Sequence, residues 1–507
     1  MTYTLSYYGG EIVPESTTGG NTPKFFSLDS SNPFMLHFYN KLPKGNYELC
    51  VKAYDKISGC MACANYVIQN GEPFTTISQA IADNTTLSAG QVYAIKTQDD
   101  FAALAGKVNA SSDPFDFAGV TLYMENDITL SDVVTPVGLY SNTDSNKRPF
   151  KGTFDGQGNT ITYNDSITFA NIDSNNNSRH SLFLYITDGA VIKNVTTKCK
   201  TSTAYLSACA GIVGEAIGNE TNLVIIENCI NEANVRFSNN STLFIGGIVY
   251  DIENGIIRNC VNKGIVDNRK TNNIFFTGGI CGRSTSSLLY NLRNEGKVTD
   301  FDSSTSYNST AAGIVGYING GNGRSVVYNC ENKGKIMGNY FVAGIIGSGD
   351  TTKEGVNVYN CCNQGEVYTK RNADSNVAGL IYKATQTELE IMNNLSAGEI
   401  GYKYQVNNYG SHTNGKKPIL SIVSISNSDT DAISSHEIFY NNIFTAGEVL
   451  SGATDEQMKN ISDKLVITST LNRWVDEQNN VSEPTRIYAR WVPDSNNYNK
   501  PHLDLGF

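Results

Sequence analysis

The sequence predicts an all-β fold, a right-handed parallel β-helix with short capping helices and a small N-terminal β domain. The first observation is an internal repeat of 31–38 residues between asparagines at equivalent places in the chain. The second is that each repeat holds three short, β-branched pieces separated by Gly or Asn. Such a unit cannot bury its apolar side alone, but stacked copies can, with strands about 4.8 Å apart. Each repeat should therefore form one turn of a solenoid.

The repeat aligns on an asparagine that is followed by a second asparagine three residues later and a glycine five residues later. The first asparagines are Asn228, Asn259, Asn291, Asn329, Asn360 and Asn393, with Asn194 as a degenerate earlier copy. The residue two before is always aliphatic, and the next residue is often a cysteine: Cys229, Cys260, Cys330 and Cys361. Cysteine in a repeated slot behaves as a small buried hydrophobe, so we expect these thiols in the core.

The first asparagine and the residue after it both look inward-facing, which breaks the alternation of a regular strand. We expect a bend there, because asparagine tolerates the left-handed conformation. Identical asparagines one turn apart can then form a hydrogen-bonded ladder. The later glycine, as in Gly264 and Gly296, predicts a second corner with a positive φ. A second apolar segment precedes each motif: Ala210–Gly214, Gly246–Val249, Gly278–Gly282, Ala312–Gly316, Ala343–Gly347 and Ala378–Ile381.

An open solenoid exposes its core and its strand edges, so both ends need caps. Thr97-Gln-Asp-Asp100 is a capping box that predicts a short helix with Phe101, Leu104 and Val108 on one face. A further helix start is predicted at Thr454–Lys464. The predicted domains are 1–92, a small β-sandwich-like attachment domain; 93–115, a helical N-terminal cap; 116–410, the parallel β-helix; and 411–507, a β-rich C-terminal cap region.

Composition excludes several classes of protein. A net charge of −11 and a pI near 5.1 argue against a nucleic-acid partner, which needs a basic stripe. No stretch is apolar for the roughly 18 residues of a membrane span, and Met1–Gly10 lacks the features of a secretory signal. The 11 cysteines therefore do not indicate a disulfide framework. Cys60 and Cys63, near Cys50, could form a metal knuckle, but no second such pair follows, and we predict no metal and no cofactor.

The alternation of Ala/Gly-Gly-Ile-Val-Gly with Asn-Cys-x-Asn-x-Gly-x-Val resembles the GLUG-type glycine-rich repeats of bacterial surface proteins. That family includes the non-catalytic part of immunoglobulin-A-cleaving metallopeptidases. The resemblance covers residues 93–507, with Gly152–Ile161 at the entry and Leu471–Trp474 and Pro501–Leu505 at the exit. It implies a parallel β-helix that serves as a spacer or an adhesive stalk, and analogy of fold does not assign an activity.

The sequence offers little for catalysis. A zinc metallopeptidase needs His-Glu-x-x-His on a helix, but the His436-Glu437 pair has Tyr440 in the fifth position. A polysaccharide lyase or hydrolase on a β-helix needs clustered carboxylates, or a carboxylate with Arg or Lys, on neighbouring turns. In the alignment Glu227, Arg258 and Glu366 stand isolated. We predict no enzyme, and a glycan-active enzyme is the alternative.

Three outward tyrosines carry the predicted site. Tyr290, Tyr328 and Tyr359 hold the slot just before the first asparagine in three consecutive turns. Because sugar rings stack on aromatic side chains, these are the predicted glycan-binding residues. The alternative is that the three rings stack on one another or are buried under a loop or a flanking domain.

The predicted function is a non-enzymatic extracellular appendage that contacts a host-surface glycan and binds other proteins through its N-terminal domain. If Met1 is the native start, a bacteriophage virion component such as a tail fibre or spike fits best. A bacterial cell-surface adhesin with its signal peptide removed is the alternative.

Overall fold

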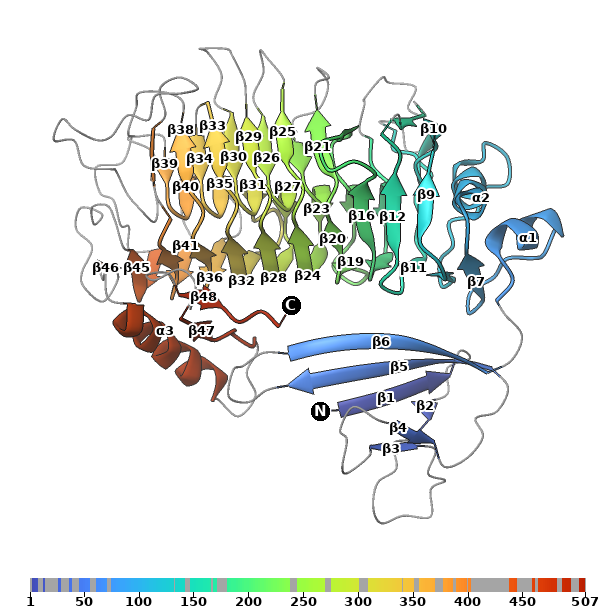
Figure 1. Cartoon of the computed structure of the whole chain (residues 1–507), viewed down its shortest axis with the longest axis horizontal. Helices are drawn as coiled ribbons and strands as arrows, with labels where there is room; N and C mark the ends of the chain where they lie inside the picture. Colours follow the sequence, from blue (N-terminus) through green and yellow to red (C-terminus); the bar gives the residue numbers. More distant parts are fainter. Residues whose placement is uncertain are drawn as a thin grey trace.

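The computed structural model is a parallel β-solenoid flanked by an N-terminal antiparallel sheet and a C-terminal helix (Figure 1). Before residue 74 it describes only the backbone of six strands. From there on it describes residues 74–131, 133–141, 146–165, 167–170, 180–237, 244–269, 275–300, 309–339, 341–350, 355–369, 377–385, 389–398, 400–402, 437–444, 458–460, 464–480, 486–493 and 501–506.

One sheet, here called the long sheet, runs along the whole solenoid and is bent at the asparagine motif. Its strands up to or through the bend are β8 (Thr121–Met124), β11 (Thr153–Asp155), β15 (Val191–Lys193), β19 (Val224–Glu227), β24 (Gly255–Asn262), β28 (Leu288–Asn294), β32 (Ser325–Asn332), β36 (Val356–Tyr359), β41 (Leu389–Met392) and β44 (Glu437–Tyr440). Beyond the bend it continues in β9 (Ile128–Leu130), β12 (Thr160–Tyr163), β16 (Thr196–Cys199), β20 (Ile230–Asn231), β37 (Cys362–Asn363), β42 (Leu395–Ser396), β45 (Asn442–Phe444) and β46 (Met458–Asn460).

Three further parallel sheets complete the turns. The second sheet stacks β14 (Phe183–Thr187), β18 (Val213–Ile217), β23 (Val249–Glu253), β27 (Cys281–Thr285), β31 (Val315–Asn319), β35 (Ile346–Asp350) and β40 (Ile381–Thr385). The third sheet stacks β17 (Tyr205–Ser207), β21 (Asn234–Phe237), β25 (Val266–Asn268), β29 (Val298–Asp300), β33 (Ile336–Gly338), β38 (Val367–Thr369) and β43 (Ile400–Tyr402). A short sheet stacks β22 (Phe244–Gly246), β26 (Phe276–Gly278), β30 (Thr310–Ala312), β34 (Phe341–Ala343) and β39 (Val377–Ala378).

The solenoid interior is one apolar cluster that runs from the N-terminal cap into the late turns. Equivalent residues of successive turns lie opposite each other, as Cys260 does with Leu292 and Leu292 with Cys330. All three are fully buried, which confirms that the cysteine slot is a core position. The predicted parallel β-helix is therefore confirmed as a β-solenoid with stacked turns.

The bend at the motif is confirmed, and the predicted second corner is wrong in its conformation. The first asparagines of the motif all have a left-handed backbone, from φ 50° at Asn360 to φ 56° at Asn393. The later glycines, by contrast, do not have a positive φ in the described turns. A Cβ at Gly296 would overlap the carbonyl oxygen of Gly264 in the turn before. Close stacking of the backbone, rather than the sign of φ, therefore excludes a side chain there.

Two helices and a strand precede the first turn at the N-terminal end of the solenoid. Helix α2 (Gln98–Asn109) opens with the expected capping box between Thr97 and Asp100. Helix α1 (Ile77–Ala82) packs into the same core, and β7 (Val92–Ile95) pairs in parallel with β8. Residues from α1 onward therefore contribute to the core at this end, ahead of residue 93, where the predicted cap begins.

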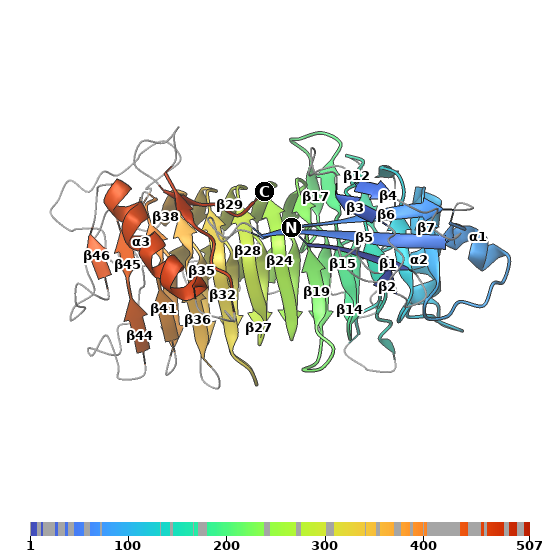
Figure 2. The same cartoon turned by 90° about the horizontal axis from the view of Figure 1, so that it is seen from below.

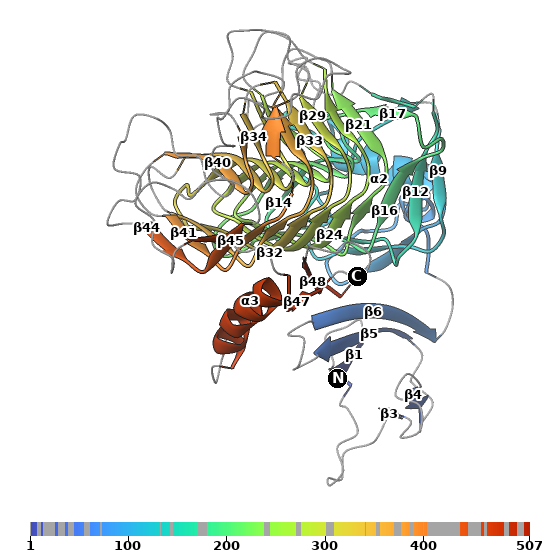
Figure 3. The same ribbon diagram turned by 60° about the vertical axis from the view of Figure 1, so that its left-hand side comes forward.

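The first 70 residues supply an antiparallel sheet of order β2-β1-β5-β6 and a small hairpin. These strands are β1 (Thr2–Tyr7), β2 (Ile12–Val13), β5 (Gly45–Tyr54) and β6 (Met61–Asn70), with β3 (Phe26–Leu28) and β4 (Leu36–Phe38) in the hairpin. A separate parallel pair, β10 (Val133–Val134) and β13 (Thr168–Phe169), lies beside the early turns. The antiparallel sheet lies on the side of the solenoid that carries the long sheet (Figure 3).

The C-terminal region returns along the outside of the long sheet (Figure 2). It contains α3 (Lys464–Asn479) and the antiparallel pair β47 (Trp491–Val492) and β48 (His502–Leu503). The helix start predicted at Thr454–Lys464 is wrong for most of that stretch. Part of it forms β46, and α3 begins only at the last residue of the stretch, Lys464. Residues 403–410 of the predicted β-helix and residues 411–436 of the predicted C-terminal cap region lie outside the described residues.

Candidate functional site

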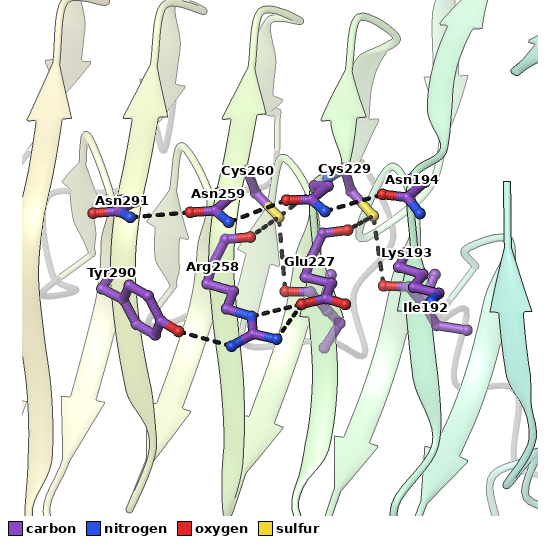
Figure 4. A network of polar contacts seen from close by, with 12 residues as sticks. Ile192, Lys193, Asn194, Glu227, Cys229, Arg258, Asn259, Cys260, Tyr290 and Asn291 are labelled. Atoms are coloured by element: carbon purple, nitrogen blue, oxygen red, sulfur yellow. Dashed lines mark hydrogen bonds and ion pairs between the residues drawn. The ribbon is translucent and has the colours of Figure 1, made fainter. Parts of the chain in front are cut away.

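Outward side chains on the long sheet form a charged and aromatic row that continues from turn to turn. Lys193 lies opposite Glu227, Glu227 opposite Arg258, and Arg258 opposite Tyr290. Arg258 Nε donates to Glu227 Oε2 over 2.6 Å, and its Nη1 donates to Tyr290 Oη over 3.0 Å (Figure 4). Lys193 pairs with Asp155 of the preceding turn at 3.4 Å. Each charge of this row therefore faces an opposite charge one turn away.

Its neighbours Tyr290 and Glu227 keep the Arg258 guanidinium charged. Burial acts to lower the pKa of Arg258, but the hydrogen bond to Tyr290 and the charge of Glu227 outweigh it and raise the pKa. The guanidinium is therefore a permanent donor on a half-buried face. A half-exposed ion pair contributes little to stability, so this network is better suited to fixing side-chain positions than to holding the fold.

Of the three predicted tyrosines, Tyr290 and Tyr328 stack on each other, and Tyr328 and Tyr359 are covered. The rings of Tyr290 and Tyr328 lie 4.8 Å apart at an interplanar angle of 9°. Tyr328 and Tyr359 are 6% and 5% exposed, while Tyr290 is half-buried. The Tyr359 hydroxyl is hydrogen-bonded to Glu390. Burial raises the pKa of Tyr328 and of Tyr359, so both hydroxyls stay protonated well beyond neutral pH.

What covers them is the C-terminal region, here called the cover: α3, β47, β48 and residues 486–490. Tyr488 packs edge-on against Tyr328 and Tyr359, with ring centroids at 5.8 and 6.2 Å. Trp474 in turn packs against Tyr488 at 4.7 Å. The same apolar cluster includes Leu471, Trp491 and Leu505. Tyr328 and Tyr359 therefore lie under a flanking region, as the alternative interpretation expected, whereas Tyr290 is half-buried. Glycan binding by the three tyrosines stays a prediction.

Beside this row runs a ladder of side-chain amides, here called the outer ladder. In each rung the Nδ2 donates to the Oδ1 of the turn before, over 2.6–3.1 Å. The rungs are Asn194, Asn228, Asn259, Asn291, Asn329, Asn360, Asn393 and Asn441. At the N-terminal end, Asn194 Nδ2 donates to Asp155 Oδ1 over 2.9 Å. The ladder predicted from the repeat is confirmed.

A second ladder, here called the inner ladder, follows the second asparagine of the motif and is fully buried. Its rungs are Asn231, Asn262, Asn294, Asn332 and Asn363, joined by bonds of 2.8 Å. Here the Nδ2 donates to the following turn, opposite to the outer ladder. It starts from the Thr197 hydroxyl, which donates to Asn231 Oδ1 over 3.0 Å. Both ladders satisfy amides that would otherwise be buried without partners.

The second sheet carries a charged cluster that the sequence alignment missed. Glu215 lies opposite Asp251, and Asp251 opposite Arg283, on three successive turns. Arg283 Nε donates to Asp251 Oδ1 over 2.7 Å. Glu215 and Asp251 are 3% and 2% exposed. The sequence holds a signal for this cluster, because each residue stands two places after the fourth residue of an apolar segment: Val213, Val249 and Cys281.

Aromatic rings lie next to this cluster, at the corner between the short and second sheets. The Arg283 guanidinium lies over the Phe244 ring at 4.7 Å. Phe244 stacks on Phe276 at 5.5 Å, and Phe276 contacts Tyr317 at 4.7 Å. Phe276, Tyr317 and Arg283 are half-buried, so part of each reaches the surface. A half-exposed corner of two rings and a guanidinium can stack on one face of a ligand and donate hydrogen bonds to it.

Metal and thiol chemistry find little support in the described part of the chain, which holds no group of three or more His, Cys, Asp or Glu that could bind a metal. Burial raises the pKa of the Cys229 and Cys281 thiols, which makes them poor nucleophiles. The side chains of Cys60 and Cys63 lie outside the described residues. Glu437–Tyr440 is a strand, so it cannot present a zinc motif in helical spacing.

Among the described residues, no helix has the length and apolar character to cross a bilayer.

Comparison with known proteins adds little. No protein-family profile matches the chain, and no curated protein matches it. A solved structure from Bacteroides ovatus, of a protein provisionally named an immunoglobulin A1 protease, superposes with a TM-score of 0.38. The two chains are 13% identical, and the alignment covers 82% of this chain and 93% of that one. A likeness this distant carries no argument about activity.

Proposed function

We propose that this protein is a non-enzymatic extracellular appendage, a stiff solenoid that holds a glycan-contacting face away from its attachment point. The observation that carries the proposal is the outer ladder, which ties each turn to the next over the length of the described solenoid. A core and two polar ladders that run in register resist bending and local opening. Reach and rigidity suit a spacer or stalk.

The glycan contact is proposed at the corner formed by Phe276, Tyr317 and Arg283, in place of the covered tyrosines. Its rings are half-buried, and its guanidinium is held by Asp251. Such a surface offers stacking and hydrogen bonding to a sugar ring together. The N-terminal sheet would serve as the attachment module, on a phage particle or on a bacterial surface.

The proposal is tested by screening the full chain against bacterial polysaccharides and a glycan array. We expect Tyr317→Ala and Phe276→Ala to weaken binding at least tenfold, because stacking area is lost. Phe341→Ala is the matched control, since Phe341 is also half-buried and lies two turns beyond Phe276 in the same row of the short sheet. Equal loss in all three variants, or no glycan bound, would contradict the proposed contact.

The alternative, a glycan-active enzyme, is favoured by one observation, the juxtaposition of Glu215 and Asp251 on neighbouring turns. Against it, both acids are almost fully buried and Asp251 is engaged by Arg283. Analysis of reducing ends after incubation with bound polysaccharide decides the matter. Cleavage that disappears in Glu215→Gln would establish the enzyme and overturn the first proposal.

A further inference from the structure

The third sheet carries two arginines that converge on one buried carboxylate. Arg236 lies opposite Asp267 of the next turn, and Asp267 lies opposite Thr299 of the turn after that. Arg236 Nε donates to Asp267 Oδ2 over 2.9 Å, and Arg236 Nη2 lies 2.8 Å from the same oxygen. Arg269 Nε also donates to this oxygen, over 2.8 Å. The Thr299 hydroxyl donates to the other carboxylate oxygen over 2.7 Å. One carboxylate therefore holds both guanidiniums in place.

An aromatic ring and the charge of Asp267 fix this arrangement further. The Arg236 guanidinium lies over the Tyr205 ring, 3.5 Å from its centroid. Burial acts to raise the pKa of Asp267, but the hydrogen bonds from its three partners outweigh burial and lower the pKa. The carboxylate is therefore ionised at neutral pH, and its charge-assisted hydrogen bonds orient two side chains that are otherwise flexible.

Both guanidiniums reach the surface, although the carboxylate between them does not. The side chain of Arg236 is 36% exposed and that of Arg269 is 47% exposed. Ser207, which lies opposite Arg236 in the turn before, is exposed as well. The third sheet lies on the side of the solenoid away from the antiparallel N-terminal sheet (Figures 1 and 3). A ligand in solvent therefore has access to the two arginines.

The charge and shape of this cluster define the group that fits it. Two guanidiniums and one carboxylate leave one positive charge here, in a chain whose net charge is −11. The planar fork of a guanidinium matches the two oxygens of a carboxylate. A single surplus charge suits a monoanionic group better than a dianionic phosphate. We infer that Arg236 and Arg269 form a binding site for the carboxylate groups of an acidic polysaccharide.

The choice of a polysaccharide rests on the function proposed above and names the class of glycan. A lone carboxylate gains little from exposed guanidiniums, because water and salt compete with it. A polymer that is also held elsewhere on the same surface makes the contact at a high effective concentration. Arg269 follows β25 and Phe276 begins β26, and these two strands of one turn contact each other. The arginines therefore lie in the same turn as part of the proposed glycan corner.

The test compares two forms of one polymer on the full chain by isothermal titration calorimetry. Polygalacturonate carries a carboxylate on every sugar, and its methyl ester presents the same sugars without the charge. We expect saturable binding of polygalacturonate and binding of the methyl ester that is weaker by about tenfold or more. Arg236→Gln and Arg269→Gln should each weaken binding of polygalacturonate by about tenfold or more, because each removes charged donors.

Two further variants separate donor geometry from charge and from folding. Lys263→Gln is the matched control, because it removes the same charge from an exposed pair with Glu232. Arg269→Lys keeps the charge beside Asp267 and replaces only the planar fork, so a loss of binding in this variant reports the geometry of the donors. Circular dichroism of each variant checks that the solenoid is folded.

Several results would overturn the inference. These are equal binding of the methyl ester, equal loss in Arg269→Gln and Lys263→Gln, or unchanged binding in Arg269→Lys. Tighter binding of poly-L-glutamate than of polygalacturonate would make the occupant an acidic peptide instead. If polygalacturonate does not bind but a neutral polysaccharide does, and Tyr317→Ala weakens that binding, the inference fails while the proposed corner stands. Binding of polygalacturonate that needs both arginines but not Tyr317 would support the inference and contradict the corner.

Discussion

The outer face of the long sheet has one half under the C-terminal cover and another half that faces the antiparallel N-terminal sheet (Figures 1 and 3). Both halves have the same repeat, the same left-handed asparagines and the same ladder. In the covered half the row beside the ladder is Tyr328 and Tyr359, and the cover seals it with apolar contacts. In the other half the row is Lys193, Glu227 and Arg258, which pair with one another or with Asp155. One slot of the repeat therefore holds an apolar, aromatic row under the cover and a row of paired charges in the other half.

The largest expected effect is loss of the cover. Trp491→Ala removes a side chain that is 1% exposed. Loss of a buried aromatic side chain lowers the free energy of unfolding by about 3–5 kcal/mol. The chain has two tryptophans, Trp474 and Trp491, and both lie in the cover. Fluorescence of Trp474 in the variant thus reports the cover alone, while far-ultraviolet circular dichroism reports the solenoid. We expect the fluorescence transition to shift to much lower temperature and the dichroism transition to change little.

Tyr290→Ala is the comparison, because Tyr290 lies at the boundary and is only half-buried. The substitution should lower the free energy of unfolding by about 1 kcal/mol or less, because little packing is lost. Similar losses from the two substitutions would remove the distinction between the halves.

An intermediate effect is expected for the ladder rungs. Asn360→Gly leaves partners in the cover and the ladder unsatisfied, since Asn360 makes four hydrogen bonds, and should cost about 2–4 kcal/mol. Asn259→Gly removes two bonds on a half-buried face and should cost about 1–2 kcal/mol. Glycine accepts the left-handed backbone, so strain does not confuse the comparison. Thermal unfolding of both variants checks the order, which a larger loss at Asn259 would reverse.

The smallest expected effect is a loss of the cover's stability at alkaline pH. Burial raises the pKa of Tyr328, Tyr359 and Tyr488 above the value of about 10 that tyrosine has when unfolded. Their contribution to stability is complete below pH 10 and is lost as pH rises through the folded pKa. Tryptophan fluorescence against pH should therefore show the cover detaching above pH 10 before the dichroism changes. Simultaneous loss of both signals would mean that the cover and the solenoid unfold together.

Sequence reasoning predicted the features that recur and missed those that depend on distant segments. The bends at Asn259 and its equivalents, the buried cysteines and the capping box at Thr97 follow from local chemistry repeated in phase. The burial of Tyr328 depends on Tyr488, which is far along the chain and belongs to no repeat. No periodicity within the motif could indicate it.

The missed cluster of Glu215, Asp251 and Arg283 has a different cause. These residues recur at one position of the apolar segment that precedes each motif, outside the asparagine motif on which the repeat aligns. The glycine five residues after Asn291 was placed correctly at a tight position, but for the wrong reason. The approach of neighbouring backbones, which excludes a side chain at Gly296, is a property of stacked turns and not of one turn.

In both ladders the amide orientation of one turn fixes that of the next, so the hydrogen bonds of each ladder all point in one direction along the solenoid. Asp155, which when ionised can only accept, orients Asn194, and every later rung of the outer ladder follows. Thr197 orients the inner ladder in the opposite sense. A turn that is duplicated or deleted in the middle would therefore join without any change in amide orientation. Such a solenoid can be lengthened or shortened in evolution while its ends, its cover and its attachment domain stay the same.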